Sequence, residues 1–123
     1  MITDFYEKVE KIIEKDARYK LDAYSFVMQA LWFIQKKLGK QGHISGKELL
    51  EGIRELGIEQ YGPMTKVVFN HWGVKKTDDF GQIVFNMVDC GLMNKTDEDT
   101  PENFKDVYDF DAALNVFNAK EKD

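Results

Sequence analysis

The spacing of apolar residues in the first part of the chain predicts two helices. The first helix carries one apolar stripe, formed by Phe5, Val9, Ile12 and Ile13. Asp4 is a good N-cap for it, and residues 16–20 break the stripe. The second helix covers about Leu21 to Leu38 and is apolar nearly all round, so we expect it to be buried nearly all round. Gly39, a residue that tolerates positive φ, marks its end.

Capping and breaking signals predict two further helices. Ser45 and Glu48 have the spacing of a capping box, in which each side chain satisfies a backbone amide at the start of a helix. Apolar residues continue one helical face from there, and Gly57 either ends this helix or interrupts it before Tyr61. A glycine–proline pair then breaks the chain. A proline suits the first position of a helix, and the next helix therefore covers Pro63 to Trp72.

The last third of the chain predicts a helix, a hairpin and a short closing helix. Thr77 is a good N-cap, and the helix after it ends at Gly91. Leu92–Thr96 and Phe104–Phe110 resemble two strands separated by an acidic turn, although the alternation in the second strand is imperfect. The closing helix, Asp111–Asn118, would place its apolar residues against the core.

This order of elements is typical of a winged helix-turn-helix, in which a recognition helix runs into a β-hairpin wing. The sequence therefore predicts a mainly α fold with a small C-terminal β-hairpin (α+β), that is, a winged-helix-like domain. The helix 63–72 is extra to that pattern, so another helical packing with a hairpin stays open. The chain has 123 residues, which fits one domain; we expect a single globular domain over 1–118 and a solvated tail over 119–123.

The distribution of charge argues against DNA binding through the predicted recognition helix and wing. Residues 1–76 carry 13 basic and 10 acidic side chains, whereas residues 77–111 carry two basic and ten acidic ones. Phosphates would repel the second segment. Its acidic surface suits a protein partner better. The candidate partner-binding residues on the outward helical face are Asp78, Asp79, Gln82, Phe85, Asn86 and Asp89.

Two alternatives stay open within this interpretation. Phe85 lies at the edge of the polar face, where it either anchors a partner or is covered by another element such as the closing helix; covering is the expectation. A winged-helix-type nucleic-acid regulator would need a basic patch in the N-terminal half. The candidates for that patch are Lys36, Lys37, Lys40 and Lys47. A solvated helix end and loop explain these lysines more simply, so a non-enzymatic adaptor or regulatory domain is the leading prediction.

No pattern in the sequence predicts catalysis, a cofactor or a metal site. His43 and His71 have no partner at a metal-ligand spacing, and we expect a loop residue and a helix C-terminal residue, respectively. Cys90 follows an aspartate at the end of its helix, which disfavours a reactive thiolate, so we expect a buried small residue. A single cysteine implies no oxidising compartment, and the chain shows neither a signal peptide nor a long apolar run. We therefore expect a cytoplasmic protein without membrane contact, of unknown partner and oligomeric state.

Six segments of distinctive sequence extend together over nearly the whole chain. They are 16–19, 23–27, 44–54, 72–74, 79–86 and 107–110. In these segments the chain resembles a family of small, conserved bacterial proteins of uncharacterised function. The resemblance implies a bacterial cytoplasmic domain and brings no activity, substrate or site residue with it. An alanine is expected where this chain has Gly57, which favours a helix that continues toward Tyr61.

Overall fold

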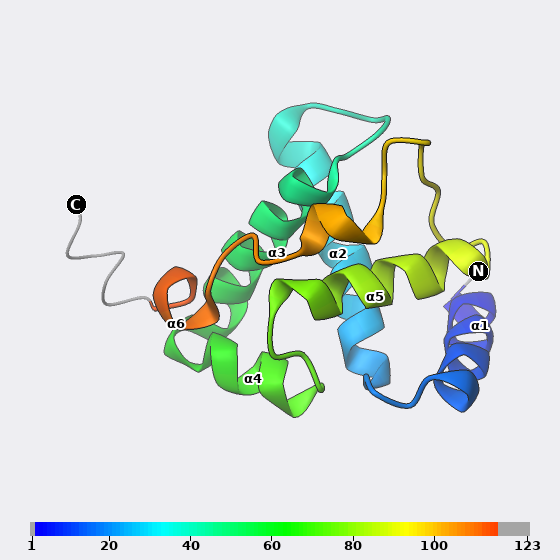
Figure 1. Ribbon diagram of the computed structural model, residues 1–123, viewed down its shortest axis with the longest axis horizontal. Helices are drawn as coiled ribbons and strands as arrows, with labels where there is room; N and C mark the ends of the chain where they lie inside the picture. The colour runs from blue at the N-terminus through cyan, green and yellow to red at the C-terminus, as the bar shows by residue number, and fades with distance from the viewer. Residues whose placement is uncertain (1, 116–123) are drawn as a thin grey trace.

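The structure is a computed structural model that describes residues 2–115, and over that range the regular elements are all helices (Figure 1). They are α1 (Ile2–Lys15), α2 (Leu21–Leu38), α3 (Gly46–Tyr61), η1 (Gly62–Met64), α4 (Thr65–His71), α5 (Thr77–Asp89), η2 (Pro101–Phe104) and α6 (Phe110–Ala113), where η marks a 3-10 helix. α2 and α3 pack side by side at the centre, with α1 at one end of the molecule and α4 and α6 at the other (Figure 1). Among the described residues, no helix combines the length and the hydropathy that crossing a membrane needs.

The contact between α2 and α3 is close because a glycine lies in it. A Cβ at Gly52 of α3 would lie 2.8 Å from the Cβ of Ile34 and 3.2 Å from the backbone oxygen of Ala30, both on α2. A larger side chain at this position would therefore push the two helices apart. This contact places α2 and α3 as the frame on which the other elements pack.

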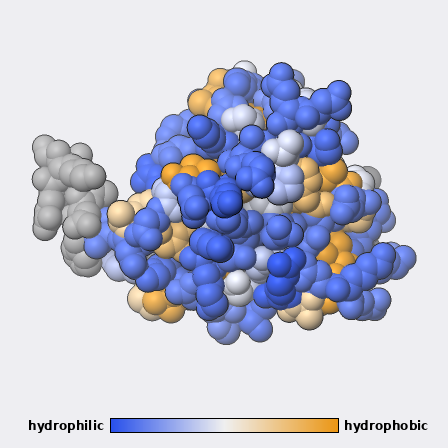
Figure 2. Space-filling model, viewed as in Figure 1, coloured by the Kyte–Doolittle hydropathy of each residue, from blue (hydrophilic) through white to orange (hydrophobic). Residues whose placement is uncertain are grey.

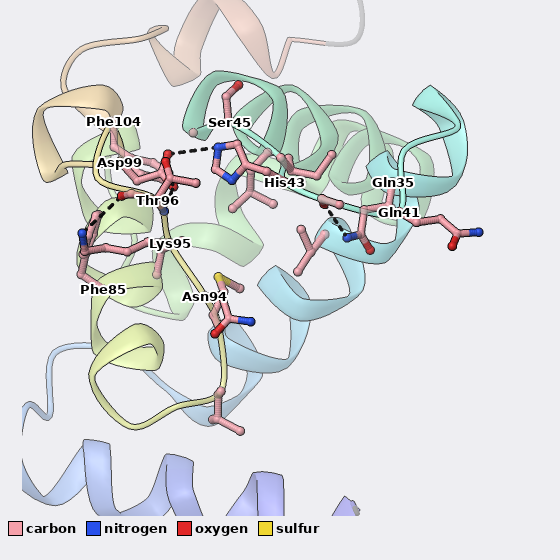
Figure 3. Close-up of a pocket in the computed structure, with 18 residues that line it drawn as sticks. Gln35, Gln41, His43, Ser45, Phe85, Asn94, Lys95, Thr96, Asp99 and Phe104 are labelled. Atoms are coloured by element: carbon pink, nitrogen blue, oxygen red, sulfur yellow. Dashed lines mark hydrogen bonds and ion pairs between the residues drawn. The ribbon is translucent and has the colours of Figure 1, made fainter.

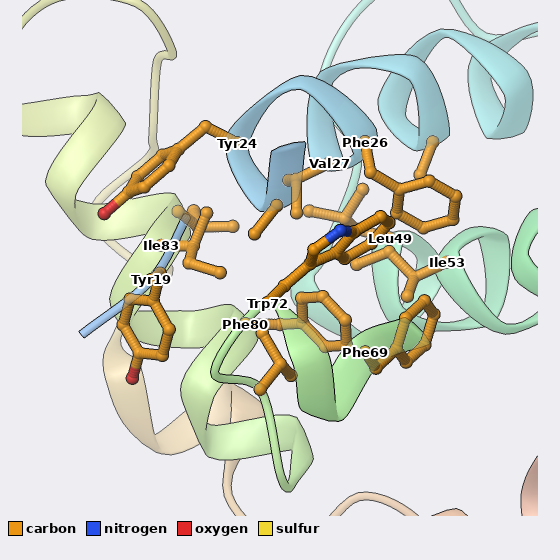
Figure 4. Packing of buried hydrophobic residues seen from close by; sticks show 14 of the residues in the cluster. Tyr19, Tyr24, Phe26, Val27, Leu49, Ile53, Phe69, Trp72, Phe80 and Ile83 are labelled. Atoms are coloured by element: carbon orange, nitrogen blue, oxygen red, sulfur yellow. The ribbon is translucent and has the colours of Figure 1, made fainter. Parts of the chain in front are cut away.

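An aromatic cluster fills the junction of α2, α4, α5 and α6 (Figure 4). Phe69 is fully buried at its centre. Its ring centroid lies 5.2–5.8 Å from those of Phe26, Trp72, Phe80 and Phe110. Aromatic pairs at such distances contribute about 0.5–1.5 kcal/mol each beyond the burial of their area. The same hydrophobic core has members in every α-helix of the described chain.

The predicted C-terminal hairpin is wrong, because residues 92–110 form no strand. Part of the predicted turn is the 3-10 helix η2, whose start is fixed by a hydrogen bond from the Thr100 amide to the Asn103 side chain (2.7 Å). Asp106 has a φ of 48°, which interrupts the extended backbone that a strand requires. The fold over the described residues is therefore mainly α rather than α+β, and the wing of the predicted winged helix is absent from it.

The apolar residues that suggested a second strand pack one by one onto helices. Phe104 is 3% exposed, and its ring fits between α3 and α5, where two glycines leave room for it. A Cβ at Gly46 would lie 3.1 Å from the ring, and a Cβ at Gly81 would lie 2.8 Å from the Cβ of Phe104. Further along, the Tyr108 hydroxyl donates to the backbone oxygen of Leu50 on α3 (2.7 Å). Contacts with helices thus replace the strand pairing that was expected.

The signals for helix ends at Gly39 and Ser45 are confirmed, whereas Asp4 lies inside α1 rather than at its N-cap. α2 has the predicted bounds and ends at Gly39, which has a φ of 67°. The capping box is present, since the Glu48 amide donates to the Ser45 hydroxyl (3.1 Å) and the Ser45 amide to the Glu48 carboxylate (2.9 Å). Gly57 does not end α3, which continues to Tyr61 as the resemblance implied.

Other details differ from the predictions. α2 is not buried nearly all round, because Trp32 is 59% exposed. Thr77 is the first residue of α5 rather than its N-cap, and its hydroxyl donates to the backbone oxygen of Phe104 (2.6 Å). Asp79 instead satisfies the free amides before the helix by accepting from Lys75 at 2.9 Å. α6 is shorter than the predicted closing helix; positions 116–118 of that helix, and the predicted tail, lie outside the described residues.

Candidate functional site

The predicted partner-binding face of α5 is largely occupied by contacts within the protein. Asp78 accepts a hydrogen bond from the backbone amide of Asp106 (3.1 Å). Asp79 accepts one from the Tyr19 hydroxyl (2.7 Å), and burial and this contact raise the pKa of Tyr19 above its usual value. The two acidic residues therefore tie the start of α5 to neighbouring segments.

The loop between α1 and α2 covers the middle of the same face. Arg18 donates to Asp16 through two hydrogen bonds of 2.8 and 2.7 Å, and it also donates to the Gln82 side chain at 3.4 Å. The Asn86 side-chain amide donates to Asp16 (3.0 Å) and to the Tyr24 hydroxyl (3.1 Å). The hydrogen bonds from Arg18 hold the pKa of Asp16 well below its usual range. Gln82 and Asn86 are thus links between the loop and α5.

Phe85 is half-buried, and the element that covers part of it is η2 rather than the closing helix. Its ring lies against that of Phe104 in η2, with centroids 6.3 Å apart and planes at 88°. Asp89 is exposed, and its carboxylate has no partner in the described part of the chain. The six predicted residues therefore do not form a continuous free surface for a partner.

A cavity of about 430 Å³ opens next to this face, between α2, α5, residues 41–46 and residues 92–99 (Figure 3). We call it the α2–α5 cavity. Its apolar lining includes Leu31, Leu49, Val84, Phe85, Met93 and Phe104. Cavities of 300–1,000 Å³ with apolar walls and a few polar groups are typical of binding sites. The sequence patterns did not predict this cavity.

One polar contact joins the two irregular walls of the α2–α5 cavity. The Nε2 atom of His43 lies 3.3 Å from Oδ1 of Asp99, as the dashed line in Figure 3 marks. The other carboxylate oxygen of Asp99 accepts from the amide (2.8 Å) and hydroxyl (3.2 Å) of Thr96. On the opposite wall, the Gln35 side chain donates to the backbone oxygen of Gly42 (3.4 Å). These bonds hold the walls in place while the space between them stays open.

The backbone amides along both irregular walls lack internal partners. Within the described chain, no backbone amide of residues 41–44 or 93–95 donates to another group. These residues are exposed or half-buried and lie outside the helices. Backbone N–H and C=O groups are strong hydrogen-bonding groups, and a row of them without partners can pair with another chain.

The remaining predicted residues have ordinary structural roles. His43 lies in a loop and His71 in the last turn of α4, as expected. Cys90 is half-buried rather than buried, and its thiol donates to a backbone oxygen one turn earlier in α5 (3.5 Å). Between residues 4 and 115, no group of three or more His, Cys, Asp or Glu side chains could hold a metal ion.

The lysines of the proposed basic patch are partly engaged in ion pairs. Lys37 pairs with Glu55, and Lys40 pairs with Glu48 at 2.8 Å. Paired carboxylates reduce the positive charge that such a patch would offer to phosphates. Figure 2 shows a mainly hydrophilic face with small, scattered apolar areas, so no broad apolar surface competes with the α2–α5 cavity on this side.

Comparison of the chain with known protein families, with functionally characterised proteins and with solved structures found no match. The geometry of the α2–α5 cavity is therefore the basis on which a function can be proposed.

Proposed function

We propose that this protein is a non-enzymatic protein-interaction domain that binds its partner in the α2–α5 cavity. The observation that carries the proposal is an apolar cavity lining flanked by two stretches, 41–44 and 93–95, whose backbone amides lack partners in the described chain. A protein segment supplies both apolar side chains and backbone hydrogen bonds, so it matches this combination. The interaction role is the one expected from the sequence, but the proposed site is the α2–α5 cavity rather than the outer face of α5.

The polar groups around the cavity support recognition rather than nucleophilic catalysis. His43 and Asp99 form a histidine–carboxylate pair, as in serine hydrolases, but here Nε2 rather than Nδ1 faces the carboxylate. Ser45 is close in sequence, but its hydroxyl caps α3, and Figure 3 shows it directed away from the His43 ring. A base that does not reach a nucleophile cannot activate it. The cytoplasmic location expected from the sequence stays a prediction.

A matched pair of charge insertions tests the proposed site. Met93→Glu places a carboxylate in the α2–α5 cavity, whereas Met64→Glu places one on η1, where the side chain is 54% exposed and outside the cavity lining. A partner is first identified by photo-crosslinking in the native host, and its affinity for the purified proteins is then measured by calorimetry. We expect Met93→Glu to weaken binding at least tenfold and Met64→Glu to change it less than twofold. Equal affinity of the two variants would contradict the proposal.

A further inference from the structure

Residues 93–95, which we call the edge, line the α2–α5 cavity at and just after a bend in the chain. The residues on either side are anchored, since the Leu92 amide donates to the backbone oxygen of Met87 (2.9 Å) and the Thr96 amide to Asp99 (2.8 Å). Between these anchors no backbone amide has a partner in the described chain. Figure 1 shows the connection between α5 and η2, to which these residues belong, as a loop that leads away from the end of α5 and returns to η2. Because both ends of the edge are anchored, it loses less conformational freedom than an unanchored loop when a second chain pairs with it.

The floor next to this edge accepts apolar side chains. In an extended segment, alternate side chains point to the same side, so every second residue of a chain paired with 93–95 would face the floor. The apolar residues that line the same cavity include Leu31, Val84 and Phe85, and we refer to them as the floor. The volume of about 430 Å³ lies within the range that buries a drug-sized ligand, so it has room for more than one aliphatic side chain.

The surface that follows the edge is acidic. Asp97 and Glu98 come directly after it and Glu102 lies at the start of η2; all three are exposed and have no ion pair in the described chain. The sole basic residue from 92 to 102 is Lys95. A chain that runs along the edge therefore meets an excess of negative charge, which favours a partner with lysine or arginine near the apolar residues.

Together these observations identify the chemistry of the partner. We propose that it is an extended segment of another protein that adds as a strand to residues 93–95, with alternating apolar residues facing the cavity and at least one lysine or arginine near Asp97 and Glu98. This inference rests on the proposed function and specifies the class of partner. A helical segment satisfies its backbone internally and would leave the edge unused.

Selection from a random library tests the inference before any natural partner is identified. Twelve-residue random peptides displayed on phage are selected on the full-length protein, and each recovered peptide is synthesised and measured against wild type, Met93→Glu and Met64→Glu. We expect the recovered peptides to have apolar residues at every second position and a net positive charge. Their affinity for Met93→Glu should be at least tenfold lower than for wild type, whereas their affinity for Met64→Glu should not fall tenfold.

Two modifications of the recovered peptide and the protein then test the mode of binding. N-methylation of alternate residues in one register should weaken binding at least tenfold, and in the other register less than threefold, because only one register faces the edge. Removing the charge of the acidic edge with the double variant Asp97→Asn and Glu98→Gln should weaken binding at least threefold at low salt. The matched double variant Glu10→Gln and Glu14→Gln, on the exposed face of α1, should not.

The outcomes separate the inference from the proposed function. Peptides with helical spacing or net negative charge that still depend on Met93 would overturn the extended, basic partner and leave the interaction role in place. No selected peptide, or only peptides that Met93→Glu does not affect, would overturn the proposed site and the inference with it. Circular dichroism and urea unfolding of each variant establish that the protein remains folded.

Discussion

Gly73 and Gly91 offer a controlled test of how the loop before α5 contacts the loop before α2. Both residues have a positive φ, of 94° and 83° respectively. A Cβ at Gly91 would have no atom within 4 Å, whereas a Cβ at Gly73 would lie 2.1 Å from the backbone oxygen of Arg18. Alanine at either position would have to adopt a positive φ of similar size. The difference between the two variants therefore isolates the contact with residues 16–20.

The magnitudes differ enough to be measured. A non-glycine residue in the left-handed region costs about 1–2 kcal/mol, which is the whole expected effect of Gly91→Ala. Gly73→Ala also forces two backbone segments apart, an overpacking effect that typically costs about 1–3 kcal/mol. Separating the two segments would also break the hydrogen bond from the Lys20 amide to the Trp72 carbonyl (3.1 Å), which contributes about 1 kcal/mol to stability. We expect Gly73→Ala to be less stable than Gly91→Ala by about 2–4 kcal/mol.

Urea unfolding followed by tryptophan fluorescence measures both variants. Trp72 is 5% exposed and adjoins Gly73, so its emission reports on the affected region. The expected result is a lower unfolding midpoint for Gly73→Ala than for Gly91→Ala, with similar slopes. Equal losses of free energy in the two variants would refute the close approach of the two loops.

Three further predictions concern single contacts, and urea unfolding measures each. Asp16→Asn removes the carboxylate that accepts from Arg18 and should lower the free energy of unfolding by about 1–2 kcal/mol at pH 7. The lowered pKa of Asp16 stabilises the folded state above the unfolded pKa of about 3.9, so the difference from wild type should shrink as the pH falls below that value. A constant difference down to pH 2 would contradict the ion pair. Tyr108→Phe should cost about 1 kcal/mol by freeing a backbone acceptor on α3, and an unchanged stability would count against that bond. Gly57→Ala should destabilise by about 1 kcal/mol despite the better helix propensity of alanine, because its Cβ would lie 2.9 Å from the fixed ring of Phe69; a more stable variant would show that the ring can yield.

The helices were predictable because their signals are local. The capping box at Ser45 and the glycine at position 39 act within a few residues, and the structure has both. Local signals did not show that the predicted hairpin is absent, because the structure that residues 92–110 adopt instead depends on contacts with distant residues. Phe104 packs against Gly46 and Gly81, and neither glycine carries a local sign that an aromatic ring will fill the space beside it.

The candidate site was misplaced for a related reason. A polar helical face predicts exposure only if no other segment covers it. Asn86 reaches Asp16 and Gln82 reaches Arg18, contacts between residues more than 60 positions apart in the sequence. The α2–α5 cavity likewise lies between two irregular segments. Its one local signal is the apolar pair Leu92–Met93, which lies outside any helix.

The central claim is that a partner binds along residues 93–95 in the α2–α5 cavity. The most direct test is to titrate the ¹⁵N-labelled protein with a selected peptide and to follow backbone amide shifts and hydrogen exchange by NMR. We expect peptide binding to cause large chemical-shift changes and slowed hydrogen exchange at the amides of 93–95. Chemical-shift changes should also occur at Leu31 and Val84, and none at Asp89. Shifts centred on Asp89 and the outer face of α5, with unchanged exchange at 93–95, would contradict it.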